Sequence, residues 1–127
     1  MKRRKTLSLL AAGAPSALAL SCAPAKPPDR RVRVPRERLR TGGRVEAEYA
    51  GDPVELRETA GGPAARSLLC THFGCRVQWE AKTASYHCPC HDGRFDGEGR
   101  PVAGPPLRPL RSLRVEVEGG DVLVGDP

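Results

Sequence analysis

Two short segments of the chain each combine two cysteines with one histidine. The first reads CTHFGC from Cys70 to Cys75, and the second reads CPCHDG from Cys88 to Gly93. Together they hold four of the five cysteines and two of the three histidines. Thiolates and imidazoles bind zinc and iron–sulfur clusters, and cysteines also form disulfides. The pattern therefore predicts a metal centre or a pair of loops joined by disulfides.

Three chemistries compete for these residues, because the C-x-H and C-x-x-H spacings pick out Cys70, His72, Cys88 and His91. A structural zinc site would use these four, but it leaves two cysteines idle and C-x-H is not the usual finger spacing. A pair of disulfides in an exported domain explains the cysteines but not the histidines. An iron–sulfur cluster bound by two cysteines and two histidines uses every member of both segments, with the remaining cysteines free to form a disulfide.

The double motif resembles the Rieske iron–sulfur proteins of cytochrome bc complexes, whose pattern is C-T-H-x-G-C with C-P-C-H-G-S-x-Y/F. Here the segments read CTHFGC and CPCHDGRF. The resemblance extends over residues 51–124 and includes a proline-containing loop within 97–110. It implies one [2Fe–2S] cluster per chain. It also implies an all-β fold, a small antiparallel sandwich or open barrel with two cluster-binding loops.

The resemblance assigns roles to the four candidate ligands. Cys70 and Cys88 would bind one iron through their thiolates, while His72 and His91 would bind the other through ring nitrogens and face solvent. Because neutral imidazoles replace two thiolates, such a cluster is less negative and accepts an electron more readily. The two histidines would also take a proton as the iron is reduced, which suits the oxidation of a quinol.

Further residues match the family or depart from it. Cys75 and Cys90 match its disulfide, and Gly104, Pro105 and Pro106 match the loop that shields the third side of the cluster. The departures follow His91, where the family often has Gly-Ser-x-Tyr.

Asp92, Gly93 and Phe95 stand at the three departing positions, so the two hydroxyl groups that bond cluster sulfurs in the family are absent. Loss of those bonds predicts a low reduction potential, suited to menaquinol rather than ubiquinol. Asp92 would act in the same direction if it is ionised and close, and Arg94 would oppose it. The alternative is that backbone N–H groups replace the missing donors.

The elements around the two segments read as short strands separated by turns. Glycine and proline together number 27 (14 + 13), and no segment has a convincing helical pattern. His87 is expected to be a strand or surface residue, and Trp79 to be part of the core. Phe73 would either contact a quinol or cap the apolar rim. The predicted strands are 45–49, 54–57, 64–69, 77–79, 85–87, 113–117 and 122–124.

The first 22 residues predict an export signal, with a basic start, an apolar stretch and a small-residue exit. Arg3 and Arg4, followed by Leu7, resemble a twin-arginine motif, and Ser21-Cys22 resembles a bacterial lipobox. The signal is either cleaved, lipidated at Cys22 or retained as an anchor. All three outcomes place the protein outside the cytoplasm. We expect it to stay at the outer, periplasmic face of the cytoplasmic membrane, tethered by an anchor or by lipid.

The rest of the chain divides into a linker and a domain. Residues 23–44 are rich in proline and arginine, which predicts an extended linker with one strand at 31–34, either solvated or in contact with anionic lipid. Residues 45–127 would form the Rieske domain. The formal net charge of +6 falls to +2 (17 basic, 15 acidic residues) after residue 22, and no aromatic residues interleave the basic ones. Nucleic-acid binding is therefore disfavoured.

The leading hypothesis for function is the iron–sulfur subunit of a quinol–cytochrome c reductase. Such a subunit accepts electrons from quinol at a cytochrome b-type subunit and passes them to a c-type cytochrome, so it is not a complete enzyme alone. An alternative is the small subunit of a periplasmic molybdenum oxidase of the arsenite oxidase type, or a free exported carrier. A ferredoxin of a ring-hydroxylating oxygenase fits least, because those domains generally lack the cysteines at positions 75 and 90.

Overall fold

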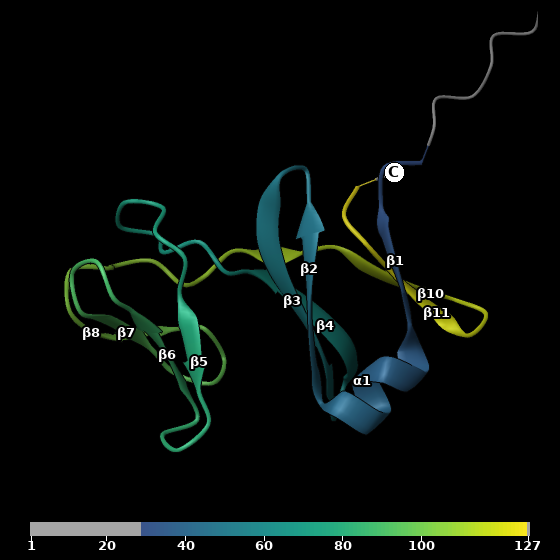
Figure 1. Ribbon diagram of the computed structural model, residues 1–127, viewed down its shortest axis with the longest axis horizontal. Helices are drawn as coiled ribbons and strands as arrows, with labels where there is room; N and C mark the ends of the chain where they lie inside the picture. The colour runs from purple at the N-terminus through teal and green to yellow at the C-terminus, as the bar shows by residue number, and fades with distance from the viewer. Residues whose placement is uncertain (1–28, 127) are drawn as a thin grey trace, which may run out of the picture.

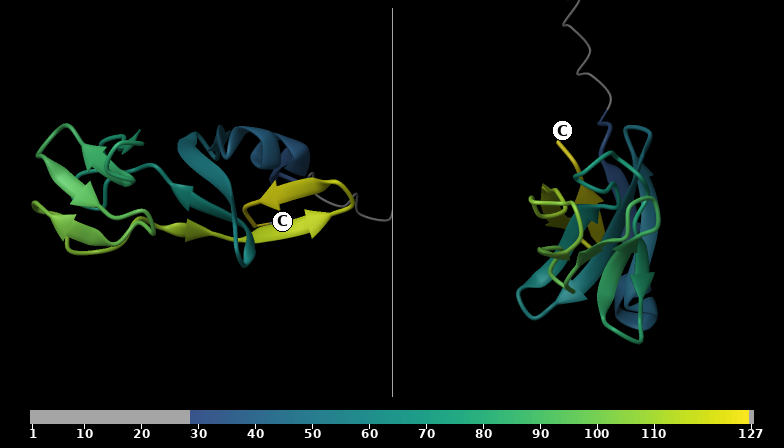
Figure 2. Two further views of the ribbon diagram at one scale, coloured as in Figure 1. Left: turned by 90° about the horizontal axis from the view of Figure 1, so that it is seen from below. Right: turned by 90° about the vertical axis from the view of Figure 1, so that its left-hand side faces the viewer.

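The computed structural model describes residues 29–126, which form two lobes built on antiparallel sheets (Figure 1). The large lobe comprises residues 29–67 and 112–126, and the small lobe comprises residues 68–111. Seen from a second direction, the lobes lie end to end along the long axis of the molecule (Figure 2). The chain leaves the large lobe after strand β4 (Gly62–Ser67) and returns to it at strand β9 (Ser112–Leu113). The predicted all-β antiparallel fold is confirmed.

The large lobe contains two sheets and one short helix. One sheet has the order β1-β11-β10 and the other has the order β2-β3-β4-β9. Their cores are built from alternating side chains: in β2, for example, Val45 is buried while Glu46 and Glu48 are exposed. The elements are β1 (Val32–Pro35), α1 (Arg36–Gly42), β2 (Arg44–Tyr49), β3 (Asp52–Thr59), β4 (Gly62–Ser67), β9 (Ser112–Leu113), β10 (Val115–Glu118) and β11 (Asp121–Val124).

The small lobe contains one four-stranded antiparallel sheet of order β5-β6-β7-β8. Its strands are β5 (Gln78–Glu80), β6 (Ser85–Cys88), β7 (Gly93–Phe95) and β8 (Pro101–Ala103). The predicted hairpin at 77–87 is confirmed, with Trp79 opposite Tyr86 in the register. Strands β7 and β8 are short and contain glycine, proline and charged residues, so no sequence pattern indicated them. The buried residues of this lobe are Leu68, Cys70, Val77, Tyr86, Cys88, Phe95 and Leu110.

Residues 32–42 are part of the folded domain, contrary to the predicted linker at 23–44 and to the prediction of no helix, whereas the strand predicted at 31–34 is present as β1. Val34 in β1 and Leu39 in α1 are only 3% and 1% exposed, and both belong to the core of the large lobe. Strand β1 pairs with β11 along its whole length. The helix has a single buried apolar residue, so its sequence carries no amphipathic pattern. Tertiary burial of Leu39 stabilises it instead.

Three arginines of this segment bind carboxylates of the same domain. Four of the five ion pairs join side chains that are distant in sequence, and the fifth, between Arg31 and Asp29, is local. Their guanidinium groups lie 2.5–3.0 Å from the carboxylate oxygens. The partners are Arg31 with Asp29 and Glu116, Arg33 with Glu118 and Asp121, and Arg36 with Glu58.

The predicted export signal, with Arg3, Arg4 and Cys22, lies outside the described residues. Between residues 29 and 126, the structure contains no helix that is both long and apolar enough to span a membrane.

A buried polar network joins the two lobes. Arg44 of β2 donates from Nη1 to Oε1 of Glu55 in β3 at 2.5 Å and to the hydroxyl of Tyr86 in β6 at 2.9 Å. The Tyr86 hydroxyl donates in turn to Glu55 Oε1 at 2.6 Å. Burial, reinforced by the Glu55 carboxylate, raises the pKa of Tyr86 above its ordinary value, so the hydroxyl stays protonated. Because Tyr86 lies two residues before Cys88, this network positions the strand that leads into the second Cys/His loop.

Candidate functional site

Two loops at one end of the small lobe carry the candidate ligands. The first loop follows β4 and contains Cys70 and His72. The second joins β6 to β7, with Cys88 at the end of β6 and His91 in the loop itself. The first loop is closed by a bridge between Leu69 and Arg76 and by a hydrogen bond from the Cys70 N–H to the Cys75 carbonyl at 2.7 Å. Both loops therefore start and end on paired backbone, which limits their movement.

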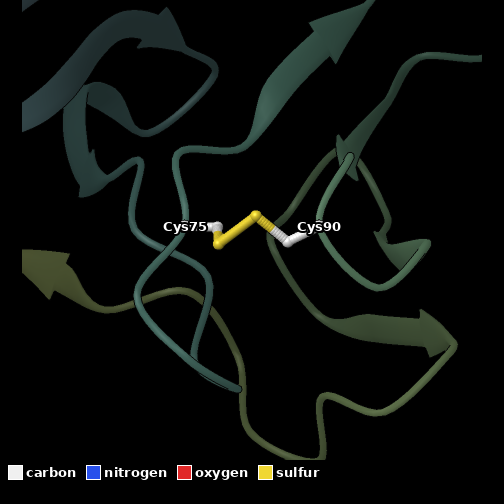
Figure 3. Close-up of a disulfide and its surroundings, with 2 residues drawn as sticks. All are labelled: Cys75 and Cys90. Carbon is white, nitrogen blue, oxygen red and sulfur yellow. A yellow bond between two sulfur atoms is a disulfide. The ribbon is translucent and has the colours of Figure 1, made fainter.

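A disulfide between Cys75 and Cys90 ties the two loops together (Figure 3). The Cα atoms of the two cysteines are 6.5 Å apart, within the usual range for disulfides. The predicted pairing is thus confirmed. It leaves two other cysteines of the described region with free thiols, and these are Cys70 and Cys88.

The two free thiols are buried next to each other. Cys70 is 4% exposed and Cys88 is 1% exposed. Burial, assisted by the neighbouring Cys88 thiol, raises the pKa of Cys70 above its ordinary value. Without a cation, a thiolate at Cys70 would therefore be costly, and this thiol stays protonated. A bound metal removes that cost, because thiolates are its ligands.

The two histidines of the motif come together at the open side of the loops. Their ring centroids are 4.9 Å apart and the rings are nearly perpendicular. His91 is exposed and His72 is partly buried. Within residues 29–126, Nδ1 of His72 is buried and has no hydrogen-bond partner. Leaving a buried ring nitrogen without a hydrogen bond costs about 1–3 kcal/mol of folding free energy. Such a nitrogen can bind a metal through its lone pair. The two thiols and two imidazoles therefore fit a cluster with two cysteine and two histidine ligands.

A different group of sulfurs also lies close together. Those of Cys75, Cys88 and Cys90 are all within 4.8 Å of one another. Two of these sulfurs form the disulfide, so only the Cys88 thiol is available to a metal. The group is therefore not a three-thiolate site, and it shows instead that the disulfide lies directly against one candidate ligand.

The predicted shielding loop packs against the second ligand loop. Gly104 has φ 80°, and a Cβ at this position would be 2.8 Å from the Asp92 carbonyl oxygen. Pro106 is buried, and its Cγ lies 2.8 Å from the point where a Cβ on Gly93 would be. Residues 104–106 can approach so closely only because positions 93 and 104 lack side chains. Pro105, between them, is exposed.

The residues predicted to tune the potential have distinct surroundings. Asp92 has φ 55°, and its Oδ1 lies 2.7 Å from Nε2 of His87 and 3.8 Å from a guanidinium nitrogen of Arg94. Phe95 is fully buried in the core of the small lobe. The pairing of His87 with Asp92 was not predicted. It arises because β6 and β7 are antiparallel, which brings together the two ends of the second loop.

Aromatic side chains surround the site at different depths. Phe73 is 71% exposed, and its ring centroid is 4.0 Å from that of His72 and 5.4 Å from that of His91. It therefore lies exposed beside both ligand histidines. Trp79 is partly buried and packs against the small-lobe core, but its ring also stacks under the Arg44 guanidinium at 3.3 Å. That cation–π contact connects the lobes and was not predicted.

The strand scaffold, the disulfide-linked loops and the Cys/His donor set define a small electron-transfer domain that carries an iron–sulfur cluster. A family model described as "Rieske [2Fe-2S] domain" matches residues 31–114, and the chain belongs to this family. The match begins at residue 31, so it includes β1 and α1. The cofactor is therefore a [2Fe–2S] cluster, as predicted.

Two relatives by sequence come from Chlorobaculum tepidum. A carotenoid phi-ring synthase is 46% identical over 84 residues, which is 66% of this chain and 13% of that protein. A cytochrome b6-f complex iron-sulfur subunit is 32% identical over 77 residues, which is 61% of this chain and 42% of that protein. The chain thus spans less than half the length of either relative.

Two solved structures share the fold at similar identity. The plasma membrane Rieske protein PetC3 of Synechocystis PCC 6803 is 30% identical with a TM-score of 0.64, covering 75% of this chain and 99% of that one. The ferredoxin of carbazole 1,9a-dioxygenase from Nocardioides aromaticivorans IC177 is also 30% identical, with a TM-score of 0.55, covering 78% of this chain and 100% of that one. One Rieske scaffold therefore serves proteins of different electron-transfer systems.

Proposed function

We propose that Cys70 and Cys88 bind one iron of the cluster and that His72 and His91 bind the other. Three observations support this assignment. The two thiols are free, adjacent and buried. Nδ1 of His72 is buried without a partner within the described region. The remaining two cysteines of the loops form the disulfide and cannot be thiolate ligands.

We also propose that the chain takes electrons from a quinol and passes them to a cytochrome, as the iron–sulfur subunit of a quinol–cytochrome c reductase. The observation that carries this proposal is the exposed His91 ring beside His72 and the exposed Phe73. The cluster supplies one-electron chemistry at a potential raised by histidine ligation. The solvent-facing ring of His91 can hydrogen-bond a quinol hydroxyl and accept its proton, while Phe73 offers an apolar contact to the ring of the quinol.

The relatives give independent support for this class of complex. Cytochrome b6-f iron-sulfur subunits are among them, and PetC3 is a plasma-membrane Rieske protein. They do not favour the alternative of a molybdenum-oxidase small subunit. In line with the N-terminal sequence, we place the protein at the outer face of the cytoplasmic membrane, tethered by an anchor or by lipid at Cys22. Mass spectrometry of the mature N-terminus distinguishes a lipidated Cys22, a cleaved signal and an intact Met1.

Affinity purification of the tagged full chain from its native membranes tests the proposal. We expect a b-type haem spectrum in the purified material, together with quinol-dependent reduction of cytochrome c that a cytochrome b inhibitor blocks. A matched preparation of a His91→Ala chain should retain the b-type haem but lose the activity. Recovery of the wild-type chain without b-type haem and without quinol oxidation would overturn the proposed complex.

A second candidate is electron delivery to an oxidoreductase that acts on carotenoids. It is favoured by one observation, the 46% identity to part of a carotenoid phi-ring synthase, which exceeds the identity to the cytochrome b6-f subunit. The same affinity purification separates the two candidates. In the second case a carotenoid-modifying enzyme, rather than a b-type cytochrome, accompanies the chain, and cytochrome c is not reduced.

A further inference from the structure

Two arginines of the small lobe have no acidic partner. Arg108 and Arg111 are both exposed, and no described carboxylate oxygen lies within 4.0 Å of either guanidinium group. The other three arginines of this lobe are all paired, namely Arg76 with Glu46, Arg94 with Glu80 and Arg100 with Asp96. Uncompensated positive charge on the small lobe is therefore concentrated at these two arginines and at Lys82, which lies in the turn between β5 and β6.

The two arginines lie beside the first ligand loop. Thr71, Arg108, Pro109 and Arg111 line one shallow pocket. The Thr71 hydroxyl donates to the Arg108 carbonyl at 2.7 Å, and Nη2 of Arg108 lies 3.4 Å from the Thr71 carbonyl oxygen. Thr71 stands between Cys70 and His72 in the sequence. The positive charge of Arg108 is thus held against the backbone of the loop that carries two proposed ligands.

Large exposed apolar side chains lie close in sequence to the residues that line this pocket. Leu107 is 90% exposed next to Arg108, and Phe73 is 71% exposed two residues after Thr71. Exposed apolar side chains beside arginine are typical of surfaces that bind another protein. Binding to anionic lipid is less favoured, because lipid-binding segments usually hold about four to eight clustered basic residues. We call the surface formed by Phe73, Thr71, Leu107, Arg108, Pro109 and Arg111 the basic face.

We propose that the basic face docks an acidic electron-transfer protein. This inference rests on the proposed function as an electron carrier, and it adds the chemistry of the partner and the place where it binds. Negative groups on the partner would approach Arg108 and Arg111, which have no internal carboxylate to compete with them. The partner's redox centre would then lie next to the first ligand loop. Where the partner is a cytochrome, one electron passes to its ferric haem, which becomes ferrous, and no bond is made or broken.

Stopped-flow kinetics on the purified full chain with its cluster test this inference. The reduced chain is mixed with an acidic c-type cytochrome, and in parallel with a basic one, over a range of ionic strength. The test variant is Arg108→Gln/Arg111→Gln. The matched control is Arg38→Gln/Arg40→Gln, which removes the same charge from two exposed arginines of α1 in the large lobe. The reduction potential of each protein is measured so that rates are compared at known driving force.

We expect the test variant to react with the acidic cytochrome about 3–10-fold more slowly than wild type at low ionic strength, because electrostatic steering is lost. The difference should disappear at high salt, where the charges are screened. The control variant should differ from wild type by less than about twofold. With the basic cytochrome, the test variant should react no more slowly than wild type.

Several results would overturn the inference. Equal slowing in the test and control variants would mean a general effect of net charge. If a changed reduction potential of the test variant accounts for its slower rate, the two arginines act on the cluster and not on binding of the partner. Loss of binding to phosphatidylglycerol vesicles in the test variant, with an unchanged rate to the acidic cytochrome, would assign the basic face to the membrane. A chain with a redox-active cluster that reduces neither cytochrome would instead refute cytochrome reduction itself, and with it this partner.

Discussion

The two histidines of the ligand loops have different surroundings. His72 is partly buried beneath Phe73 and has one nitrogen without a partner within residues 29–126, whereas His91 is exposed. The third histidine, His87, lies in β6, and its Nε2 is bonded to Asp92. These differences separate two residues that can bind iron and contact a substrate from one whose nitrogen is already occupied by a carboxylate.

Replacing either ligand histidine should therefore abolish the cluster. We expect His72→Ala and His91→Ala each to contain little iron and acid-labile sulfide, because the remaining three ligands hold the centre poorly. His87→Ala is the matched control and should retain the cluster. Metal analysis and electron spin resonance of the reduced proteins check this. Full cluster content in His91→Ala, or equal loss in His87→Ala, would contradict the ligand assignment.

The lack of two hydroxyl groups predicts a low potential, but the structure restricts the test. A Cβ on Gly93 would be 2.8 Å from Pro106 Cγ and 3.0 Å from its Cδ. A serine at position 93 therefore cannot enter without moving a rigid ring of the shielding loop. The proline thus occupies the space that the family's serine side chain would need.

Phe95→Tyr should raise the reduction potential, because a hydroxyl bonded to a cluster sulfur stabilises the reduced state. One bond worth roughly 0.5–1.5 kcal/mol corresponds to about 20–65 mV for a one-electron couple. Gly93→Ser alone should lower cluster content, whereas Gly93→Ser/Pro106→Ala should regain the cluster and also raise the potential. Redox titration checks these values. If Phe95→Tyr retains its cluster without a rise, hydroxyl loss does not set the potential of this protein.

Among the secondary-structure elements, the site consists of three loops that a disulfide and close backbone packing hold together. The disulfide connects the first two loops, and Gly104 allows the third to lie against the second. The strands beneath are short, and β7 and β8 have three residues each. Loops on such strands depend on these cross-links for their relative position.

Removing the disulfide should make the cluster sensitive to oxygen. The cysteines are 15 positions apart, and closing a loop of this size contributes about 3 kcal/mol on chain entropy. We expect Cys75→Ala/Cys90→Ala to lose its visible absorbance faster in air than wild type, beyond what the lower stability explains. The double variant avoids leaving a reactive thiol beside Cys88. An unchanged lifetime of the cluster in air would show that the disulfide does not hold the loops in position.

Asp96 organises the turn between β7 and β8. Its Oδ1 accepts the backbone N–H groups of Glu98 and Arg100, both at 2.9 Å. Burial raises its pKa, but these N–H groups outweigh that effect, so the pKa of Asp96 lies below its ordinary value of 3.8. A lowered pKa stabilises the folded state above pH 3.8, and that contribution is lost as the pH falls through the lower folded value.

Asp96→Ala should therefore reduce the free energy of unfolding by about 1–2 kcal/mol at neutral pH. The difference from wild type should shrink in acid below pH 3.8. Denaturant unfolding at several pH values measures both effects, and Asp126→Ala is an exposed control. A difference that is the same at pH 7 and in strong acid would argue against the hydrogen-bonded carboxylate as the cause.

At the scale of the whole molecule, the two lobes are joined by the network of Arg44, Glu55 and Tyr86. Glu55 is 2% exposed and bonds both other members. Arg66 adds a second connection, since it donates to the Gly97 carbonyl at 3.1 Å. The small lobe is thereby held in one orientation on the large lobe, although separate cores stabilise each of them.

Glu55→Ala should lower the free energy of unfolding by about 3–5 kcal/mol, because it leaves the Arg44 charge and the Tyr86 hydroxyl without their acceptor. Tyr86→Phe removes only the hydroxyl and should cost about 1–2 kcal/mol. Glu48→Ala, an exposed glutamate on β2, should change stability by less than about 0.5 kcal/mol. Denaturant titrations followed by cluster absorbance and by circular dichroism measure these effects. Equal stability of Glu55→Ala and Glu48→Ala would rule out a structural role for the network.

Local features of this protein could be predicted from its amino-acid sequence. The spacing within two segments of six residues indicated four candidate ligands and left Cys75 and Cys90 to form a disulfide. The resemblance to the family indicated the [2Fe–2S] cluster. The hairpins at 77–87 and 113–124 follow from alternating side chains around a turn. Each of these depends on residues that are close in the chain, so their patterns are visible in one dimension.

Contacts between residues that are distant in the chain could not be predicted in this way and are known from the three-dimensional structure. The helix at 36–42 forms because Leu39 is buried in a core that other strands supply. Arg31 reaches Glu116 across 85 positions, so a segment that reads as a basic linker is part of the domain. Pro106 fills the space beside Gly93, and Arg108 and Arg111 remain unpaired because no described carboxylate folds next to them. Packing and charge pairing act through space, and a local sequence pattern does not record which partners folding brings together.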